Sequence, residues 1–160
     1  MSEPRKIWCP HVTVATVVAD DDRFLMVEED IRGERRFNQP AGHLEPDETL
    51  AAAAVRETRE ETGWDVALDH FIGTWQWWSP VHNEYIVRFA FAGHTLTPHP
   101  EQALDTGICR ALWLRRDEII TRGQQLRSPL VLASIDAWLA GQRLPLSVLH
   151  DLLPQTVTTP

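Results

Sequence analysis

Cysteine is scarce in this sequence, because Cys9 and Cys109 are the only two among 160 residues. Neither stands in a CxxC pair or at a spacing from histidine that is typical of zinc ligands. Small domains stabilised by several disulfides, and structural zinc sites, need more cysteines than this, at closer spacing. We therefore expect two reduced thiols, and neither a disulfide framework nor a zinc site.

Basic residues are fewer than acidic ones, with 15 Lys and Arg against 23 Asp and Glu, so the net charge is −8 with neutral histidines. Proteins that bind nucleic acid polymers rely on basic patches that neutralise phosphates. We therefore expect no nucleic acid partner. A small phosphorylated metabolite stays open as a ligand, because a divalent metal can neutralise a local group of carboxylates.

Long hydrophobic runs are also missing. The apolar stretch VTVATVVA near the N-terminus is too short to span a membrane, and it lacks the basic flank and cleavage site of a leader. We expect a cytoplasmic protein without a membrane partner. A hydrophobic content of 43% over this length is enough for one hydrophobic core, so we expect residues 1–160 to form a single domain. The main part of this domain is expected at about 10–142, followed by a tail at 143–160. A monomer and a homodimer both fit the sequence.

Runs of β-branched and aromatic residues predict most of the strands. Acidic residues 20–22 indicate a hairpin turn between the first two, and Ser79-Pro80 joins two longer ones. The polar, proline-rich residues 94–107 predict a long loop. The predicted strands and extended segments lie at 11–19, 23–29, 36–42, 66–78, 84–93 and 108–114.

Helix signals alternate with these strands. An alanine-rich helix is predicted at about 50–62, with Thr49 as N-cap and Gly63 as its stop. A short helix follows the last strand, and a terminal helix is expected to have Ser128 as N-cap and to end at Gly141. Several strands follow one another directly, which favours an α/β (α+β) fold in which helices flank a mixed sheet.

Three glutamates gather near the end of the first predicted helix, in the stretch RETREETG. Glu57, Glu60 and Glu61 lie within about 60° of one another around the helix axis. Read alone, the stretch favours a solvated helix face, on which Arg56 and Glu60 form an i,i+4 ion pair. In a cleft, the same carboxylate oxygens are the ligands that Mg²⁺ or Mn²⁺ prefers. The spacing of the three glutamates does not decide between these interpretations.

The residues around this stretch complete a longer pattern. Gly42 is followed after five residues by Glu48, and after seven more by Arg56, which gives G-x5-E-x7-R-E-T-x-E-E-x-G-W. This resembles the Nudix box, in which a bulky apolar residue stands where this chain has Thr58. Outside the box, residues 11–150 resemble the bacterial phosphatase NudJ branch of the family. The resemblance implies a Nudix α/β/α sandwich and an enzyme that hydrolyses phosphoanhydride bonds.

The resemblance also implies a metal site and its ligands. By position in the box, Glu57, Glu60 and Glu61 would bind Mg²⁺, or Mn²⁺, and the backbone carbonyl of Ala41 would be a further ligand. The chemistry implied is attack of water on phosphorus, with the cation offsetting charge and lowering the pKa of the water. Glu57, or a carboxylate from outside the box, would accept the proton.

Further box positions carry supporting roles by the same resemblance. Arg56 would hold a carboxylate in place with Glu48 as its partner, and Gly42 would let the loop pass close to the helix and the phosphates. Family members differ in the carboxylate that assists from outside the box. The candidates here are Asp105 first, and then Glu101 and Glu84, each of which also fits a solvated surface acid.

Four residues are candidate substrate contacts. Arg36, next to Arg35, fits a phosphate clamp or a surface arginine, and His43 fits a phosphate contact or a polar loop histidine. Phe37 is a candidate wall of the site. Trp77 is a candidate for stacking on a heteroaromatic ring, with core packing as the alternative.

Tryptophans are concentrated in one predicted strand, which contains Trp75, Trp77 and Trp78. Regular alternation puts Phe71, Trp75 and Trp77 on one face of the sheet, and Ile72 and Trp78 on the other. One face is then expected to pack under a helix, and the other to offer a ring to a ligand.

Similarity to the NudJ branch implies nucleoside tri- or diphosphates as substrates, or pyrimidine pyrophosphates such as hydroxymethylpyrimidine pyrophosphate and thiamine pyrophosphate. One alternative is another nucleotide-linked diphosphate, such as ADP-ribose or a dinucleoside polyphosphate. The other is a non-catalytic nucleotide-binding module, which the retained box glutamates disfavour.

Overall fold

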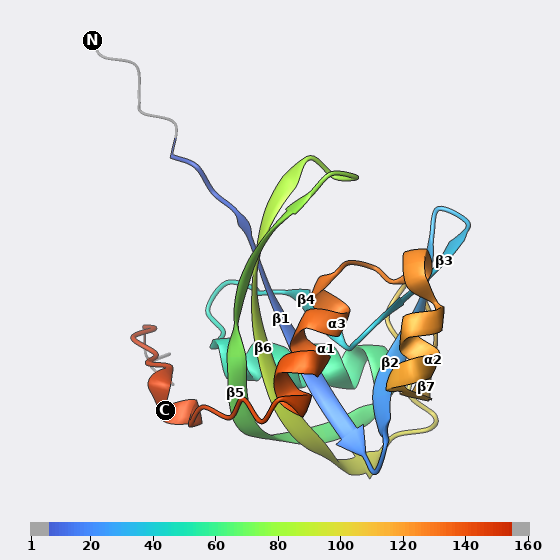
Figure 1. Cartoon of the computed structure of the whole chain (residues 1–160). Coiled ribbons are helices and arrows are strands. Elements are labelled where there is room, and N and C mark those ends of the chain that lie inside the picture. The colour runs from blue at the N-terminus through green and yellow to red at the C-terminus, as the bar shows by residue number, and fades with distance from the viewer. Residues whose placement is uncertain (1–6, 155–160) are drawn as a thin grey trace.

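The computed structural model describes residues 7–154, whose strands form one mixed sheet with helices on both of its faces (Figure 1). This confirms the predicted fold class. The strands are β1 (His11–Asp20), β2 (Arg23–Ile31), β3 (Glu34–Asn38), β4 (Ala41–His43), β5 (Trp64–Ser79), β6 (Glu84–Pro98) and β7 (Ile108–Arg115). The α-helices are α1 (Leu50–Thr62), α2 (Arg116–Thr121) and α3 (Leu130–Leu139), with 3-10 turns at Gly123–Gln125 and Leu146–Val148.

The sheet runs in the order β3-β2-β1-β6-β5, while β4 pairs with β1 and β7 pairs with β2. Only β1 and β6 are parallel among the paired strands of the described residues, and the other pairs are antiparallel. Long antiparallel β5 and β6 form a hairpin that projects beyond the helices (Figure 1). The strand order places β1 at the centre, where β-branched side chains bury both of its faces.

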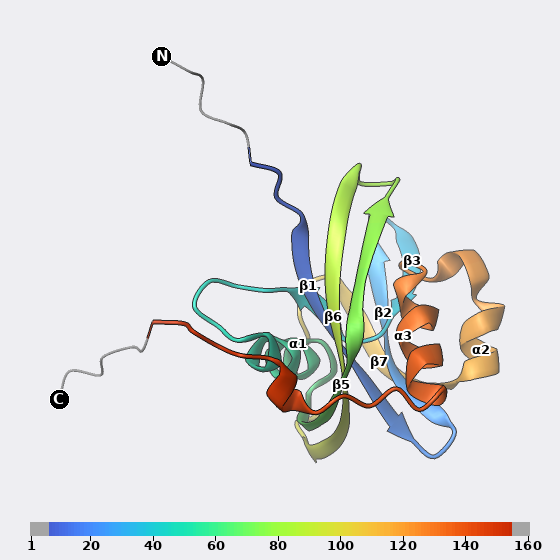
Figure 2. The same ribbon diagram turned by 60° about the vertical axis from the view of Figure 1, so that its left-hand side comes forward.

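α1 covers one face of the sheet, and α2 and α3 cover the other (Figure 2). Under α3, Val131 and Ile135 join a core cluster with Met26 and Ile72. On the opposite face, the residues that α1 contributes to the buried core cluster are alanines, Ala53 and Ala54. Because alanine is small, α1 lies close to the backbone of the strands beneath it. That proximity matters for the site described below.

The first helix begins and ends where its sequence predicts. The Thr49 hydroxyl accepts a hydrogen bond from the Ala52 N–H at 3.0 Å, and Gly63 adopts a left-handed conformation with φ of 70°. These two residues confirm the predicted bounds of 50–62. The last turn of α1 is therefore fixed, and so is the orientation of the glutamates on it.

Strands β1 and β2 separate away from their shared turn. They pair only next to that turn, where Ala19 lies opposite Phe24 and Asp20 opposite Arg23. Beyond it, β1 pairs with β4 and β6, while β2 pairs with β3 and β7. Two neighbouring strands that change partners in this way leave a gap between their far ends, and side chains from both strands line it.

The chain after α3 packs more extensively than the predicted tail. Phe71 and Leu144 exchange two backbone hydrogen bonds of 2.9 Å across the edge of β5. Leu146 and Leu149 then pack against the buried cluster under α1. The tail thus crosses from the α3 face to the α1 face, and residues 143–149 belong to the packed structure. The last residues of the predicted tail, 155–160, lie outside the described residues.

Two further predictions need correction. Residues 94–98 continue β6, because their pairing with β5 extends to Pro98 opposite Trp64, so the predicted loop is shorter than expected. Ser128 is not the N-cap of the terminal helix. Pro129 occupies that position, and the Ser128 hydroxyl has no hydrogen-bond partner among the described residues.

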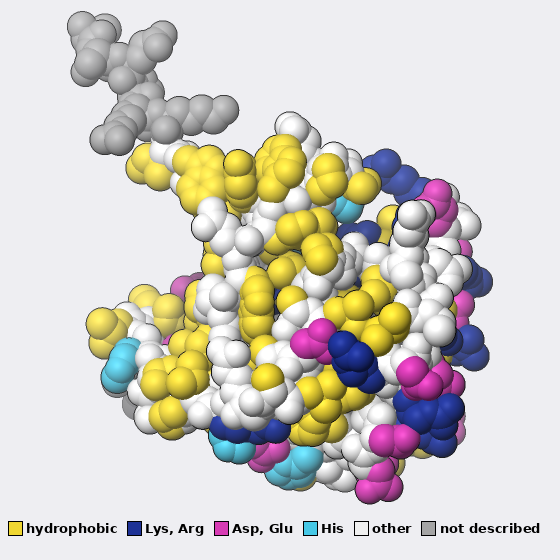
Figure 3. Space-filling view, in the orientation of Figure 1, with side chains coloured by type: hydrophobic (Ala, Val, Ile, Leu, Met, Phe, Trp, Pro, Cys, Tyr) yellow, Lys and Arg dark blue, Asp and Glu magenta, His cyan; other side chains and the backbone are white. Residues whose placement is uncertain are grey.

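Apolar side chains gather over the outer end of the β5–β6 hairpin (Figure 3). Trp78 and Trp8 both contact Tyr85, with ring centroids 4.7 and 5.3 Å apart, and all three rings are at least 40% exposed. Among residues 7–154, no helix is long and apolar enough to cross a membrane.

Candidate active site

A cavity of about 530 Å³ lies where β1 and β2 separate. Its lining comes from the start of β1, the ends of β2, β3 and β5, β4, α1, the start of β6, the loop before β7 and the segment before α3. This volume is typical of small-molecule sites. Six residues proposed from the sequence line it together with Gly42, namely Ala41, His43, Glu57, Glu61, Trp77 and Asp105.

Gly42 packs directly against the carboxylate of Glu57. A Cβ atom built on Gly42 would lie 2.1 Å from the Glu57 Cδ and 2.2 Å from both of its carboxylate oxygens. A side chain at position 42 would displace the Glu57 carboxylate, so glycine lets this carboxylate lie directly against the backbone of β4. The spacing between the box glycine and the box helix therefore sets where the Glu57 carboxylate lies.

Arg56 holds several carboxylates beside the cavity. Its Nε and Nη2 donate to the two oxygens of Glu48 at 3.0 and 2.7 Å, and its Nη1 donates to Glu57 at 2.8 Å and to Glu60 at 3.0 Å. Nη2 also donates to the carbonyl of His43 at 3.1 Å, which ties the guanidinium to β4. The hydrogen bonds from Arg56 lower the pKa of Glu48.

The box helix places two buried carboxylates in the cavity wall, Glu57 and Glu61, with exposed fractions of 8% and 7%. Burial raises the pKa of Glu61 to about 9, although the Ala41 N–H donates to its Oε2 at 2.9 Å. The negative charges of Glu29, Glu57 and Asp105 raise the pKa of Glu61 further. Burial also raises the pKa of Glu57, against the effect of Arg56. This wall holds more negative charge than the chain itself compensates.

Glu60 takes a different position from its two neighbours. Its side chain is 45% exposed, and it is paired with Arg56 instead of lining the cavity. Its backbone carbonyl accepts a hydrogen bond of 2.9 Å from the Asp105 N–H, so the loop before β7 is fastened to the end of α1. Within residues 7–154, no three His, Cys, Asp or Glu side chains already stand in an arrangement that holds a metal ion.

The other proposed acids differ in their placement. Asp105 faces the cavity, and its charge raises the pKa values of both Glu57 and Glu61. Glu84 also lines the cavity, on the far side, where it lies 3.5 Å from His11. Glu101 lies outside the lining, on the exposed part of the loop. Of the three proposed acids, Asp105 is therefore the one whose charge acts on the buried box carboxylates.

Two proposed substrate contacts lie outside this cavity. Phe37 is 7% exposed within the core under α3, and the Arg122 guanidinium lies 4.4 Å from its ring centroid, so it does not form a wall of the cavity. Arg36 hydrogen-bonds the Gln124 carbonyl and, at 2.5 Å, Glu34, beside an adjoining hollow of about 890 Å³. Both residues belong to β3, and neither lines the cavity that contains the box carboxylates.

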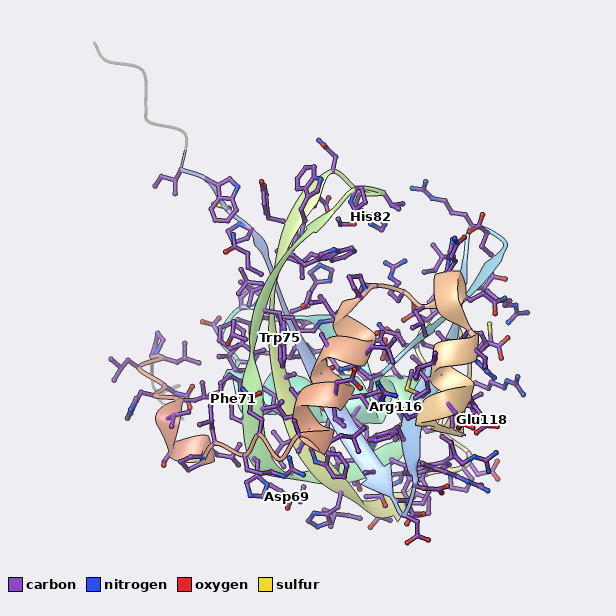
Figure 4. All side chains as sticks on the ribbon, viewed as in Figure 1. Asp69, Phe71, Trp75, His82, Arg116 and Glu118 are labelled. Atoms are coloured by element: carbon purple, nitrogen blue, oxygen red, sulfur yellow. The ribbon has the colours of Figure 1, made fainter. Side chains whose placement is uncertain are left out.

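The tryptophan strand departs from regular alternation. β5 has an irregularity in its pairing with β6 between Phe71 and Gly73, where two steps along β5 match one step along β6. Phe71 therefore packs under α1, whereas Trp75 packs with Ile72 in the core under α3 (Figure 4). The predicted grouping of Phe71 with Trp75 is wrong for this reason. Trp77 follows Trp75 and reaches the cavity.

Several polar residues of the cavity were missed from the sequence. Arg88 is 6% exposed, and burial lowers its pKa to about 10. Glu29 is buried with it, receives a hydrogen bond of 3.2 Å from Asn38, and lies 3.7 Å from Arg127. Burial raises the pKa of Glu29. An arginine within the apolar run YIVRFAFA was the available signal, because a charged residue in a buried strand requires a partner.

Comparison with known proteins agrees with this geometry. A family model described as NUDIX domain matches residues 10–134. Phosphatase NudJ of Escherichia coli (strain K12) is 46% identical over 142 residues, which cover 89% of this chain and 92% of that protein. Phosphatase NudJ of Shigella sonnei gives the same values.

Solved structures are similar as well. A NUDIX hydrolase from Nitrosomonas europaea superposes with a TM-score of 0.88 at 42% identity, over 89% of this chain and 97% of that one. A bifunctional NMN adenylyltransferase/ADP ribose pyrophosphatase from Francisella tularensis, solved with AMP and a manganese ion, has a TM-score of 0.62 at 22% identity. The match covers 83% of this chain and 42% of that one, and it shows a shared fold.

Proposed function

The chain belongs to the NUDIX domain family of hydrolases, and we propose that it is a Mg²⁺- or Mn²⁺-dependent pyrophosphohydrolase or phosphatase. Its substrates on this proposal are nucleoside tri- or diphosphates, or pyrimidine pyrophosphates such as hydroxymethylpyrimidine pyrophosphate and thiamine pyrophosphate. One observation carries the proposal: the box helix presents two buried carboxylates, Glu57 and Glu61, to a cavity of ligand size. The 46% identity to phosphatase NudJ supports hydrolysis of a phosphorylated substrate.

The carboxylate wall fits a hard divalent cation. Carboxylate oxygens that are buried together repel one another, and a cation between them relieves both the repulsion and the loss of solvation. Glu57 and Glu61 meet this condition, since burial and the charges of neighbouring acids, among them Asp105, raise the pKa values of both. We expect Glu60 and the carbonyl of Ala41 to complete the ligand set, Glu60 by turning from Arg56 towards its neighbours.

The chain's own residues have distinct parts in the proposed reaction. When bound, the divalent cation would offset charge on the phosphate oxygens and lower the pKa of the attacking water. Glu57, or Asp105 across the cavity, would accept the proton that the water loses. Arg56 would keep Glu57 in position through its hydrogen bond of 2.8 Å while Glu48 neutralises the rest of the guanidinium.

A substrate panel tests the proposal directly. The purified protein would be assayed with Mg²⁺ and with Mn²⁺ on nucleoside tri- and diphosphates, the two pyrimidine pyrophosphates and ADP-ribose. Release of orthophosphate and of pyrophosphate would be scored separately, because the ratio identifies the bond that breaks. We expect metal-dependent hydrolysis of the first two classes. A strong preference for ADP-ribose over all of them would contradict the proposed substrate class.

A further inference from the structure

The loop at 99–107 connects β6 to β7 and carries Asp105, one of the two proposed proton acceptors. The apolar residues of this loop are exposed or half-buried, so apolar burial does little to hold it in place. Asp105 is exposed as well, yet it lines the cavity, and its charge raises the pKa values of Glu57 and Glu61. Polar contacts of the loop therefore have to keep this carboxylate at the cavity.

Four polar side chains fasten the start of the loop to the end of α1 and to β5. Gln102 bonds Arg59 twice, because its Oε1 accepts from the Arg59 Nε at 2.8 Å and its Nε2 donates to the Arg59 carbonyl at 3.0 Å. The Nη1 of Arg59 also donates to Asp65, whose second carboxylate oxygen lies 2.7 Å from the Nε2 of His99. We call these residues the loop network: Arg59, Asp65, His99 and Gln102.

Backbone hydrogen bonds attach both ends of the same loop. The His99 N–H donates to the carbonyl of Gly63, the C-cap residue of α1, at 2.7 Å. At the other end, the Gly107 carbonyl accepts from the Asp30 N–H of β2 at 2.8 Å. Asp105, whose own N–H bonds the last turn of α1, lies between these two attachments.

The last turn of α1 contacts the loop on one side and the cavity on the other. Successive side chains of a helix project about 100° apart, so Arg59 and Glu61, two residues apart, leave nearly opposite sides of α1. Glu61 lines the cavity, and Arg59 reaches the loop. One helical turn therefore sets where Asp105 lies relative to the buried carboxylates.

We infer that the members of the loop network are positioning residues, which keep Asp105 directed at the box carboxylates and so assist the proposed hydrolysis. A single exposed ion pair contributes little, and the side chains of Arg59, Asp65 and His99 are 41%, 33% and 33% exposed. The network differs from such a pair because one guanidinium fork joins three segments, namely α1, β5 and the loop. The inference rests on the proposed function, since the place of Asp105 matters only if its carboxylate takes part in the reaction.

Amide hydrogen exchange measured by NMR in EDTA tests the anchoring without metal or substrate. The Asp105 N–H is the probe, because it exchanges when the loop leaves the last turn of α1. The variants are Gln102→Ala and Arg59→Met. The matched control is Arg116→Met, which breaks an ion pair of similar exposure between α2 and α3, the two-bond contact of Arg116 with Asp136. The same spectra show whether each variant is folded.

We expect Gln102→Ala and Arg59→Met each to speed exchange of the Asp105 N–H by roughly tenfold, as the loss of two hydrogen bonds implies. In Arg116→Met the rate should stay within about twofold, because that pair lies away from the loop. Unchanged exchange in the folded variants of the loop network would overturn the inference.

Kinetics with Mg²⁺ then separate positioning from mere anchoring. Gln102→Ala should lower kcat by about tenfold or more and leave KM within about twofold, because the displaced group acts on the attacking water and not on the bound substrate. In an Asp105→Asn background, the same change should cause no further loss, since both act through one carboxylate. Gln102→Glu, which keeps the acceptor for the Arg59 Nε, should recover part of kcat.

Three kinetic results would overturn the inference: an unchanged kcat in Gln102→Ala despite faster exchange, an unchanged kcat in Asp105→Asn, or an equal loss from Gln102→Ala in both backgrounds. A parent protein that hydrolyses nothing in the substrate panel would instead contradict the proposed function. The exchange rates would still decide in that case whether the network holds the loop.

Discussion

Glu48 and Glu61 both belong to the box, but their surroundings have opposite effects on their charge. Two hydrogen bonds from Arg56 lower the pKa of Glu48, so its negative charge is stabilised. Burial among other acids raises the pKa of Glu61 to about 9. Glu57 lies between these extremes, because it contacts Arg56 and is buried as well. The same motif therefore places its carboxylates in two opposite electrostatic environments.

The largest effect is expected from Glu57→Gln. The change removes a negative charge from the cavity wall and keeps the shape, so kcat/KM should fall by about 10²- to 10⁴-fold. The free energy of unfolding, measured in EDTA, should be preserved or increased, since a buried like charge is lost. Asp22→Asn, on an exposed turn, is the control for charge. Unchanged turnover in Glu57→Gln would show that the metal site is wrongly assigned.

Gly42→Ala moves the same carboxylate without changing it. The added methyl group would occupy the position of the Glu57 side chain, so we expect at least a roughly tenfold loss of kcat/KM and a destabilisation of about 1–3 kcal/mol. Steady-state kinetics and urea unfolding would measure these. In the double variant with Glu57→Gln, the two losses of activity should be less than additive. Full additivity would mean that Gly42 acts through another residue.

The raised pKa of Glu61 predicts a pH dependence of the metal-free protein. Between the ordinary value of 4.5 and about 9, the folded state keeps a proton that the unfolded state releases. Stability in EDTA should therefore decrease as the pH rises through this range, by at most about 1.4 kcal/mol per unit from this group. Urea unfolding at several pH values measures the slope. Glu61→Gln should flatten it, and an equally steep slope in that variant would exclude Glu61 as its source.

Thr49→Ala is expected to have the smallest effect. It removes the N-cap hydrogen bond to Ala52 at the end of α1 remote from Glu61, and it should cost about 1 kcal/mol of stability. Because Thr49 does not line the cavity, kcat/KM should stay within about twofold. Thermal unfolding and the same assay would be compared with Thr49→Ser, which keeps the hydroxyl. A large loss of activity would show that the cap also positions the carboxylates.

Local signals were sufficient where one segment determines its own structure. The bounds of α1 could be predicted, because the Thr49 cap and the Gly63 stop act within the helix. The fixed spacing from Gly42 to the glutamates likewise indicated which residues meet, and the structure brings Gly42 and Glu57 into contact. Even so, the spacing did not show that Glu60 turns away from the cavity.

Features that depend on a partner segment could not be predicted in this way. The position of Phe37 in the core depends on Arg122 and α3, which follow it by many residues. The burial of Arg88 arises only when β6 is placed beside β1. The predicted Ser128 cap was wrong because the neighbouring Pro129 occupies the N-cap position instead. Each of these outcomes is decided by tertiary packing, which competes with local preference.

The irregular pairing at Phe71–Gly73 has a consequence for how this hairpin tolerates insertions and deletions. One extra residue on β5 reverses which side chains beyond it face α3. Deleting a single residue there would turn Trp75 and Trp77 outward, and Thr74 and Trp78 inward, although every contact before the deletion would stay in place. The pairing register of β5 therefore determines which of its aromatic side chains can line the cavity.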